Sequence, residues 1–215
     1  MTTRFDRKAF FDAARPIFLH LSVAQVAGCE AILAEAVRRR IGDQRHLAYM
    51  LATAFWETAR AMQPVREVGQ GRARPYGVPD AATHQVYYGR GLVQLTWKAN
   101  YARMAAICAV DLVADADRAL DLDVAVKILF EGMLRGLFTG KKLADYLNAD
   151  CTDWVGARRI VNGTDQAQTV AVFAQQFDAA LRAAARESPV PPPATAAKAP
   201  PTLTNRLKSF FGLDA

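Results

Sequence analysis

The chain has 215 residues, 52% of them hydrophobic, and a formal net charge of +6, which suits one domain with a good-sized core. Its uncharged stretches are too short to span a bilayer, and residues 1–11 lack the apolar segment of a signal peptide, so we expect cytoplasmic synthesis without general secretory export. Cys29, Cys108 and Cys151 are widely spaced and form no CxxC or Cys/His cluster, which argues against a disulfide framework and a zinc site.

The positive charge favours polyanionic partners such as nucleic acid, anionic lipid or an acidic wall polymer. No Lys/Arg-rich block interleaved with aromatic residues occurs, and the glycines form no phosphate-binding loop between a strand and a helix. Nucleic acid is therefore the least supported of these partners.

Two helices are predicted from their capping residues. Ser22 and Gln25 form a capping box that starts a helix running to about residue 40, with Gly42 as its C-terminal cap. Asp43 caps the next helix, which is expected to end before Pro64. Apolar side chains on one face of this second helix recur at three- and four-residue spacing: Leu47, Met50, Leu51, Ala54 and Phe55.

The composition and the hydrophobic periodicity change in the middle of the chain. Residues 67–88 are rich in Gly, Pro and Arg without a sustained period, which predicts a long functional loop or a small irregular sheet. Helical periodicity returns at 97–110, 124–138 and 165–186, with a shorter segment near 141–147. These patterns predict a mainly α fold with a small irregular β element.

The composition shifts after residue 187. We predict one folded domain at 1–187, a stiff Pro/Ala-rich linker at 188–202 and a short tail at 203–215. The tail is either an amphipathic helix that makes transient contact with a membrane or a disordered end.

Glu57 is the first candidate for chemistry. Helical spacing places it on the shoulder of the apolar stripe, near Met50 and Ala54. A partly desolvated carboxyl group holds its proton more strongly, as a general acid for glycosidic cleavage must. The alternative is an ordinary exposed glutamate paired with Arg60, and spacing alone favours that alternative.

Glu67 follows the predicted end of the helix, where the adjacent Arg66 would keep it ionised. Two carboxyl groups in unlike environments are what an acid and a base for glycoside hydrolysis require. The alternative for Glu67 alone, a solvated loop residue, is again the better supported one.

Residues 87–101 combine paired glycines, amides, a hydroxyl and aromatic rings, a mixture that suits the faces and polar groups of sugars. An alternative assigns Tyr88, Trp97 and Tyr101 to the core and the glycines to a hairpin.

Three segments together carry a resemblance: the run from Glu57 to Glu67, the run Tyr88-Gly-Arg-Gly-Leu-Val-Gln-Leu-Thr-Trp97, and Arg159-Ile-Val-Asn-Gly163. In this order they resemble the family 19 glycoside hydrolases, the plant-type chitinases and related phage endolysins. The resemblance is sharpest over residues 46–104 and returns at 154–163. It implies a lysozyme-like helical domain with a small β element beside the cleft, and no metal or organic cofactor.

The resemblance also implies roles for individual residues. Glu57 would be the general acid, Glu67 the base that activates water, and Thr96 a residue that helps to hold that water. The family inverts the anomeric centre, which agrees with carboxyl groups on separate elements. Positions expected to bind substrate are Tyr88, Arg90, Gln94, Trp97, Asn100, Tyr101 and Asn162.

The sequence departs from the family at three places. Trp56 stands where the family commonly has His, Ala59 and Arg60 stand where small residues such as Gly are usual, and no arginine occurs between Gly163 and Arg182, where the chitinases place one. The short spacing between Glu57 and Glu67 is closer to that of the endolysins.

The first hypothesis is therefore a monomeric endolysin-type muramidase that acts on peptidoglycan in the periplasm after release or delivery. A chitinase is the alternative enzyme. A glycan-binding relative without activity and a basic nucleic-acid-binding helical domain are the alternatives from other classes, although both carboxylates are retained and the Lys and Arg residues are dispersed.

Overall fold

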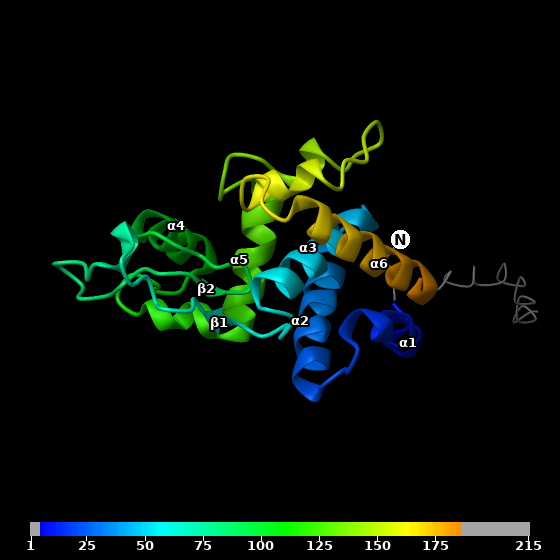
Figure 1. The fold of residues 1–215 in the computed structure, drawn as a ribbon, viewed down its shortest axis with the longest axis horizontal. Helices are drawn as coiled ribbons and strands as arrows, with labels where there is room; N and C mark the ends of the chain where they lie inside the picture. Colours follow the sequence, from blue (N-terminus) through cyan, green and yellow to red (C-terminus); the bar gives the residue numbers. More distant parts are fainter. Residues whose placement is uncertain (1–4, 186–215) are drawn as a thin grey trace, which may run out of the picture.

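A computed structural model describes residues 5–185, so the predicted linker and tail lie outside the described residues. Within that range the protein is mainly α, as predicted, with a single small sheet (Figure 1). The helices are α1 (Arg7–Phe18), α2 (Val23–Arg39), α3 (Gln44–Glu57), α4 (Lys98–Cys108), α5 (Leu122–Arg135) and α6 (Ala167–Ala184). Short 3-10 helices are η1 (Pro75–Gly77), η2 (Ala116–Leu120), η3 (Leu143–Asp145) and η4 (Gly156–Ile160).

Helix α6 packs against both α1 and α3 (Figure 1). Phe18 of α1, Phe55 of α3 and Phe177 of α6 meet edge to face there, with ring centroids 5.2 to 5.9 Å apart. The aromatic cluster therefore fixes α3 from the side opposite to α5.

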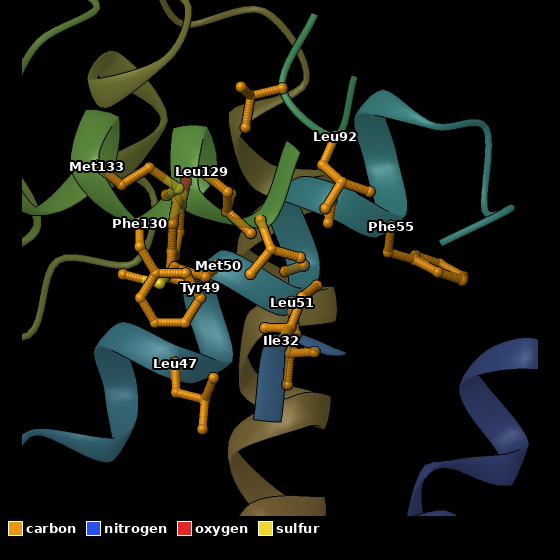
Figure 2. Close-up of a cluster of buried hydrophobic side chains, with 14 of the residues drawn as sticks. Ile32, Leu47, Tyr49, Met50, Leu51, Phe55, Leu92, Leu129, Phe130 and Met133 are labelled. Atoms are coloured by element: carbon orange, nitrogen blue, oxygen red, sulfur yellow. The ribbon is translucent and has the colours of Figure 1, made fainter. Parts of the chain in front are cut away.

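The centre of the core lies between α3 and α5. Figure 2 shows Leu129, Phe130 and Met133 of α5 near Leu47 and Met50 of α3, and all five are at most 1% exposed. Every residue of α3 from Leu47 to Phe55 is buried. Because α3 is enclosed on all sides up to its last turn, its final residue, Glu57, has a well-defined position.

The sheet consists of β1 (Val65–Arg66) and β2 (Arg90–Gly91), which pair antiparallel with Val65 opposite Gly91. Residues 67–89 leave β1 and return to β2 as an irregular loop that contains η1. This arrangement confirms the small irregular β element predicted for this part of the chain.

Most of the predicted helices are present, with ends shifted by a few residues. The capping box of Ser22 with Gln25 and the cap at Asp43 both form. Two features differ from the sequence analysis. Helix α1, capped by Asp6 and containing Pro16, was not predicted, and the C-terminal cap of α2 is Arg40 rather than Gly42. Arg40 adopts the left-handed conformation (φ 55°) and its N–H bonds to the Ala36 and Val37 carbonyls, which satisfies the helix end without glycine.

Within residues 5–185, no helix is long and apolar enough to cross a lipid bilayer.

Candidate active site

A groove of about 430 Å³ runs past the C-terminal end of α3. Its walls come from that helix end, from the segment between β2 and α4 with the first turn of α4, and from the segment after η4. Tyr76 of η1 and Phe138, which follows α5, complete them. The residues that line it are Glu57, Tyr76, Val93, Gln94, Leu95, Thr96, Trp97, Asn100, Phe138, Val161 and Asn162. Carboxylate, amide, hydroxyl and aromatic groups thus share one concave surface, as in small-molecule and glycan sites.

Glu57 is the last residue of α3 and is held by Arg158. The Arg158 guanidinium donates from Nη1 to Glu57 Oε1 at 2.6 Å and from Nε to the Asp165 carbonyl at 3.0 Å. The Arg158 side chain is 3% exposed and that of Glu57 is 15% exposed. The carboxylate is therefore partly desolvated, as expected, but it also has a buried cationic partner that the sequence analysis missed.

The ion pair between Glu57 and Arg60, which the helical spacing favoured, does not form. The Arg60 guanidinium lies over the rings of Phe55 and Phe173 instead, 5.8 Å from each centroid. Arg60 cannot follow the helical path that an i,i+3 pair needs, because α3 ends at Glu57 and Arg60 has a φ of 72°.

The 3-10 helix η4 places Arg158 against the end of α3. Gly156 begins this helix, and a Cβ there would overlap the Asp153 carboxylate and lie 3.0 Å from the Tyr146 ring. Asp153 in turn accepts from the Gly156 N–H at 2.7 Å. Glycine at this position allows the close approach that turns Arg158 inward while Arg159, its neighbour in sequence, remains exposed.

Glu67 lies at the start of the irregular loop and both carboxylate oxygens accept hydrogen bonds. Tyr76 Oη donates to Oε1 at 2.8 Å and the Gly89 N–H donates to Oε2 at 3.1 Å. Tyr76 lines the groove, whereas Glu67 does not. Glu67 is therefore linked to the groove by its hydrogen bond to Tyr76.

Arg66 does not hold Glu67, contrary to expectation. Successive residues of a strand point to opposite faces, and the Arg66 guanidinium bonds to Asp117 Oδ2 at 2.7 Å. Burial alone would raise the pKa of Asp117, but hydrogen bonds from Arg66 and Arg90 bring it below its ordinary value. Arg66 thus shares Asp117 with Arg90 in an ion-pair cluster.

The predicted polar residues Gln94, Thr96, Asn100 and Asn162 all line the groove. Thr96 Oγ1 donates to the Gln94 carbonyl at 2.8 Å, and Asn100 Nδ2 donates to the Thr96 carbonyl at 2.9 Å. These bonds orient the side chains while leaving the Thr96 oxygen lone pairs and the Asn100 carbonyl oxygen for other partners.

The predicted aromatic and basic residues separate into two groups. Trp97 lines the groove and is 49% exposed, whereas Tyr88, Arg90 and Tyr101 are at most 6% exposed. Arg90 lies 3.6 Å from the Tyr88 ring centroid and donates to Tyr101 Oη at 3.1 Å. These three residues are buried and do not line the groove, as the core alternative expected for the two tyrosines. Hydrogen bonds among the three satisfy their polar groups.

A metal site is not indicated in the described part of the chain, where no cluster of three His, Cys, Asp or Glu side chains is arranged to hold an ion.

The backbone resembles those of solved chitinases. Chitinase C from Streptomyces griseus HUT6037 matches with a TM-score of 0.60 and 21% identity, over 85% of this chain and 78% of the chitinase. A bacterial family 19 chitinase matches with a TM-score of 0.54 and 20% identity, over 82% of this chain and 94% of that one. No protein-family model and no curated protein matches the sequence.

The protein has the fold of the family 19 chitinases. The family resemblance of the three sequence segments is thus matched by the arrangement of the helices. Since identity is near 20%, the fold is what the likeness establishes, and the chemistry rests on the residues of the groove.

The departures from the family pattern have structural counterparts. Ala59 and Arg60, which stand where small residues are usual, have φ values of 48° and 72°, a region that glycine enters at least cost. The cation that meets Glu57 is Arg158, which precedes the Asn162-Gly163 motif rather than following it. Trp56, in place of His, stacks on Phe173 of α6 with ring centroids 6.5 Å apart.

Proposed function

We propose that this protein is an endolysin-type glycoside hydrolase that cleaves peptidoglycan with inversion of the anomeric centre. The observation that carries the proposal is a groove with one carboxylate on its wall and a second carboxylate hydrogen-bonded to a wall residue. Glu57 lies on its wall, held by Arg158, and Glu67 is held by Tyr76, another wall residue. One carboxyl group is on a helix end and the other on a loop beside a sheet, so neither depends on the other for its position.

In the proposed reaction, protonated Glu57 gives its proton to the glycosidic oxygen as the bond from that oxygen to the anomeric carbon breaks. A water molecule attacks the anomeric carbon from the opposite face and loses a proton to Glu67. The Trp97 ring would cover an apolar sugar face, and Gln94, Asn100 and Asn162 would meet its hydroxyl and acetamido groups. The site then returns to its starting state by transfer of one proton from Glu67 to Glu57 through solvent.

Two observations bear on the substrate. The net charge of +6 favours an anionic wall polymer, and the short run between Glu57 and Glu67 is like that of the endolysins. Chitin is the alternative substrate, favoured by the similarity to chitinases. On this proposal the protein acts as a monomer on the wall from the periplasm, after release or delivery.

The deciding experiment incubates the purified protein with isolated peptidoglycan and, separately, with chitin oligomers, followed by mass spectrometry of the new reducing ends. New muramic acid ends support a muramidase, and glucosamine ends from chitin support the alternative. No product from either substrate would refute hydrolysis and favour a glycan-binding relative. Proton NMR of freshly formed ends tests inversion.

Glu57→Gln should lower the rate by about 10²- to 10⁴-fold, because it removes the proton donor. Glu131→Gln is the matched control, since Glu131 has a similar exposure (17%) and a similar arginine ion pair at 2.6 Å, away from the groove. Glu67→Gln should cause a large but less complete loss. A wild-type rate in Glu57→Gln would remove Glu57 from the proposed role.

A further inference from the structure

We infer that Tyr76 is a positioning residue that orients the Glu67 carboxylate and joins it to the Trp97 ring on which the glycan would lie. The inference rests on the proposed function, because it assigns Tyr76 a part in the same site. Tyr76 was not among the residues predicted from the sequence, and its contacts on both sides carry the inference.

The first contact is the hydrogen bond to Glu67. Tyr76 Oη donates to Oε1 at 2.8 Å while the Gly89 N–H donates to Oε2 at 3.1 Å, so the carboxylate is held at both oxygens. Each oxygen keeps lone pairs for a water molecule. A carboxylate fixed in this way accepts a proton from a defined direction, which is what a water-activating base requires.

The second contact is with Trp97. The rings of Tyr76 and Trp97 meet edge to face, with centroids 5.2 Å apart and an interplanar angle of 78°. Both rings line the groove and Trp97 is 49% exposed. One aromatic pair therefore borders the surface available to a sugar at one end and the Glu67 carboxylate at the other.

The loop is built to hold Tyr76 in this place. Tyr76 is the middle residue of η1, which begins with Pro75 and ends with Gly77. A Cβ on Gly77 would overlap the Gly71 carbonyl, and Gly71 has a φ of 77°. The two glycines let the loop close on itself, and this closure fixes the backbone on either side of the Tyr76 ring.

The state of the phenol is also suited to the role. The hydrogen bond to Glu67 and partial burial raise the pKa of Tyr76 above its ordinary value. Its hydroxyl is therefore a donor throughout the range in which Glu67 would act as a base.

The kinetic test is Tyr76→Phe, which keeps the ring and removes the hydroxyl. On the substrate that the wild type cleaves, we expect kcat to fall about 10- to 100-fold, with KM changed less than about twofold. Tyr87→Phe is the matched control, because the Tyr87 hydroxyl bonds to Thr83 and to the Val113 carbonyl and so holds another part of the same loop. This control should retain the wild-type kcat.

A second readout does not depend on turnover. Titration of ¹³C-labelled tyrosines by NMR, with the Tyr76 signal assigned by its loss in Tyr76→Phe, should show the pKa of Tyr76 falling toward its ordinary value in Glu67→Gln. An unchanged titration would show that the hydrogen bond does not exist in solution and would overturn the inference.

The outcomes separate the two proposals. If the wild type cleaves a glycan but Tyr76→Phe keeps the wild-type kcat, the positioning role is refuted and the proposed function stands. If the wild type cleaves neither peptidoglycan nor chitin, the proposed function fails and the role of Tyr76 falls with it.

Discussion

Replacement of Arg158 by Met tests whether the buried ion pair holds the end of α3. Arg158 is 2% exposed and donates to Glu57 Oε1 at 2.6 Å and to the Asp165 carbonyl at 3.0 Å. A hydrogen bond to a charged group contributes about 1.5–3 kcal/mol. Since Glu57 faces the groove, it regains some hydration when its partner is lost. We therefore expect the free energy of unfolding to fall by about 2–4 kcal/mol, toward the low end of the range for broken buried pairs.

The assay is thermal unfolding at pH 7 followed by circular dichroism. For a chain of this size, 1 kcal/mol corresponds to about 2–4 °C, so Arg158→Met should melt about 4–16 °C below the wild type. Arg159→Met is the control, because Arg159 is the exposed neighbour on η4, and it should stay within about 2 °C. Equal melting temperatures for the two variants would refute the contribution of the ion pair.

A double-mutant cycle with Glu57→Gln then isolates the pair itself. Glu57→Gln leaves the Arg158 charge buried without a carboxylate, so it should destabilise the fold although Gln is similar in size to Glu. The double variant should lose less stability than the sum of the two single variants, by about 1 kcal/mol or more. Additive losses would mean that the contact at 2.6 Å contributes no coupling.

Two further predictions concern hydroxyl and carboxyl groups outside the groove. Tyr49 Oη is buried and has no hydrogen-bond partner among residues 5–185, so Tyr49→Phe should leave the free energy of unfolding in urea unchanged or raise it. Tyr101→Phe loses the bond from Tyr101 Oη to the Tyr88 carbonyl and should lower this free energy by about 1–3 kcal/mol. Equal losses of stability in the two variants would show that Tyr49 Oη does have a hydrogen-bond partner. Hydrogen bonds from the Lys98 ammonium, and with smaller effect from Thr83 and the Ala82 N–H, lower the pKa of Asp80 to about 2. The stability that these contacts add should therefore be present above about pH 4 and lost as the pH falls toward 2. The difference in melting temperature between the wild type and Asp80→Asn should close over that window, and a difference independent of pH would contradict the assignment.

Contacts that the sequence did not predict also stabilise the turn after α3. Ala59 and Arg60 take left-handed conformations, which cost of order 1 kcal/mol for a residue other than glycine. Arg60 offsets part of this cost by stacking over Phe55 and Phe173. The turn is further held by Thr58, whose hydroxyl donates to the Ala54 carbonyl and accepts from the Met62 N–H.

The helices of this protein were largely predictable because their signals are local. The capping box at Ser22, the cap at Asp43 and the apolar spacing in α3, α5 and α6 each involve residues within a few positions of one another. Such interactions act before any tertiary contact forms. Helix α1 escaped prediction since Pro16 interrupts its pattern and its stability comes from packing on α6.

The carboxylates, the amides and the groove tryptophan could be chosen from sequence motifs, whereas the partners that hold the carboxylates could not. Arg158 and Glu57 are 101 residues apart, and nothing in the run Arg158-Arg159 distinguishes the buried guanidinium from the exposed one. That choice depends on how η4 packs against the end of α3. In the same way, the loop closure at Gly71 and Gly77 brings Tyr76 to Glu67. The sequence alone thus determined which residues have suitable chemistry, and the tertiary structure decided which of them meet, because contacts between distant segments depend on the packing of the whole core.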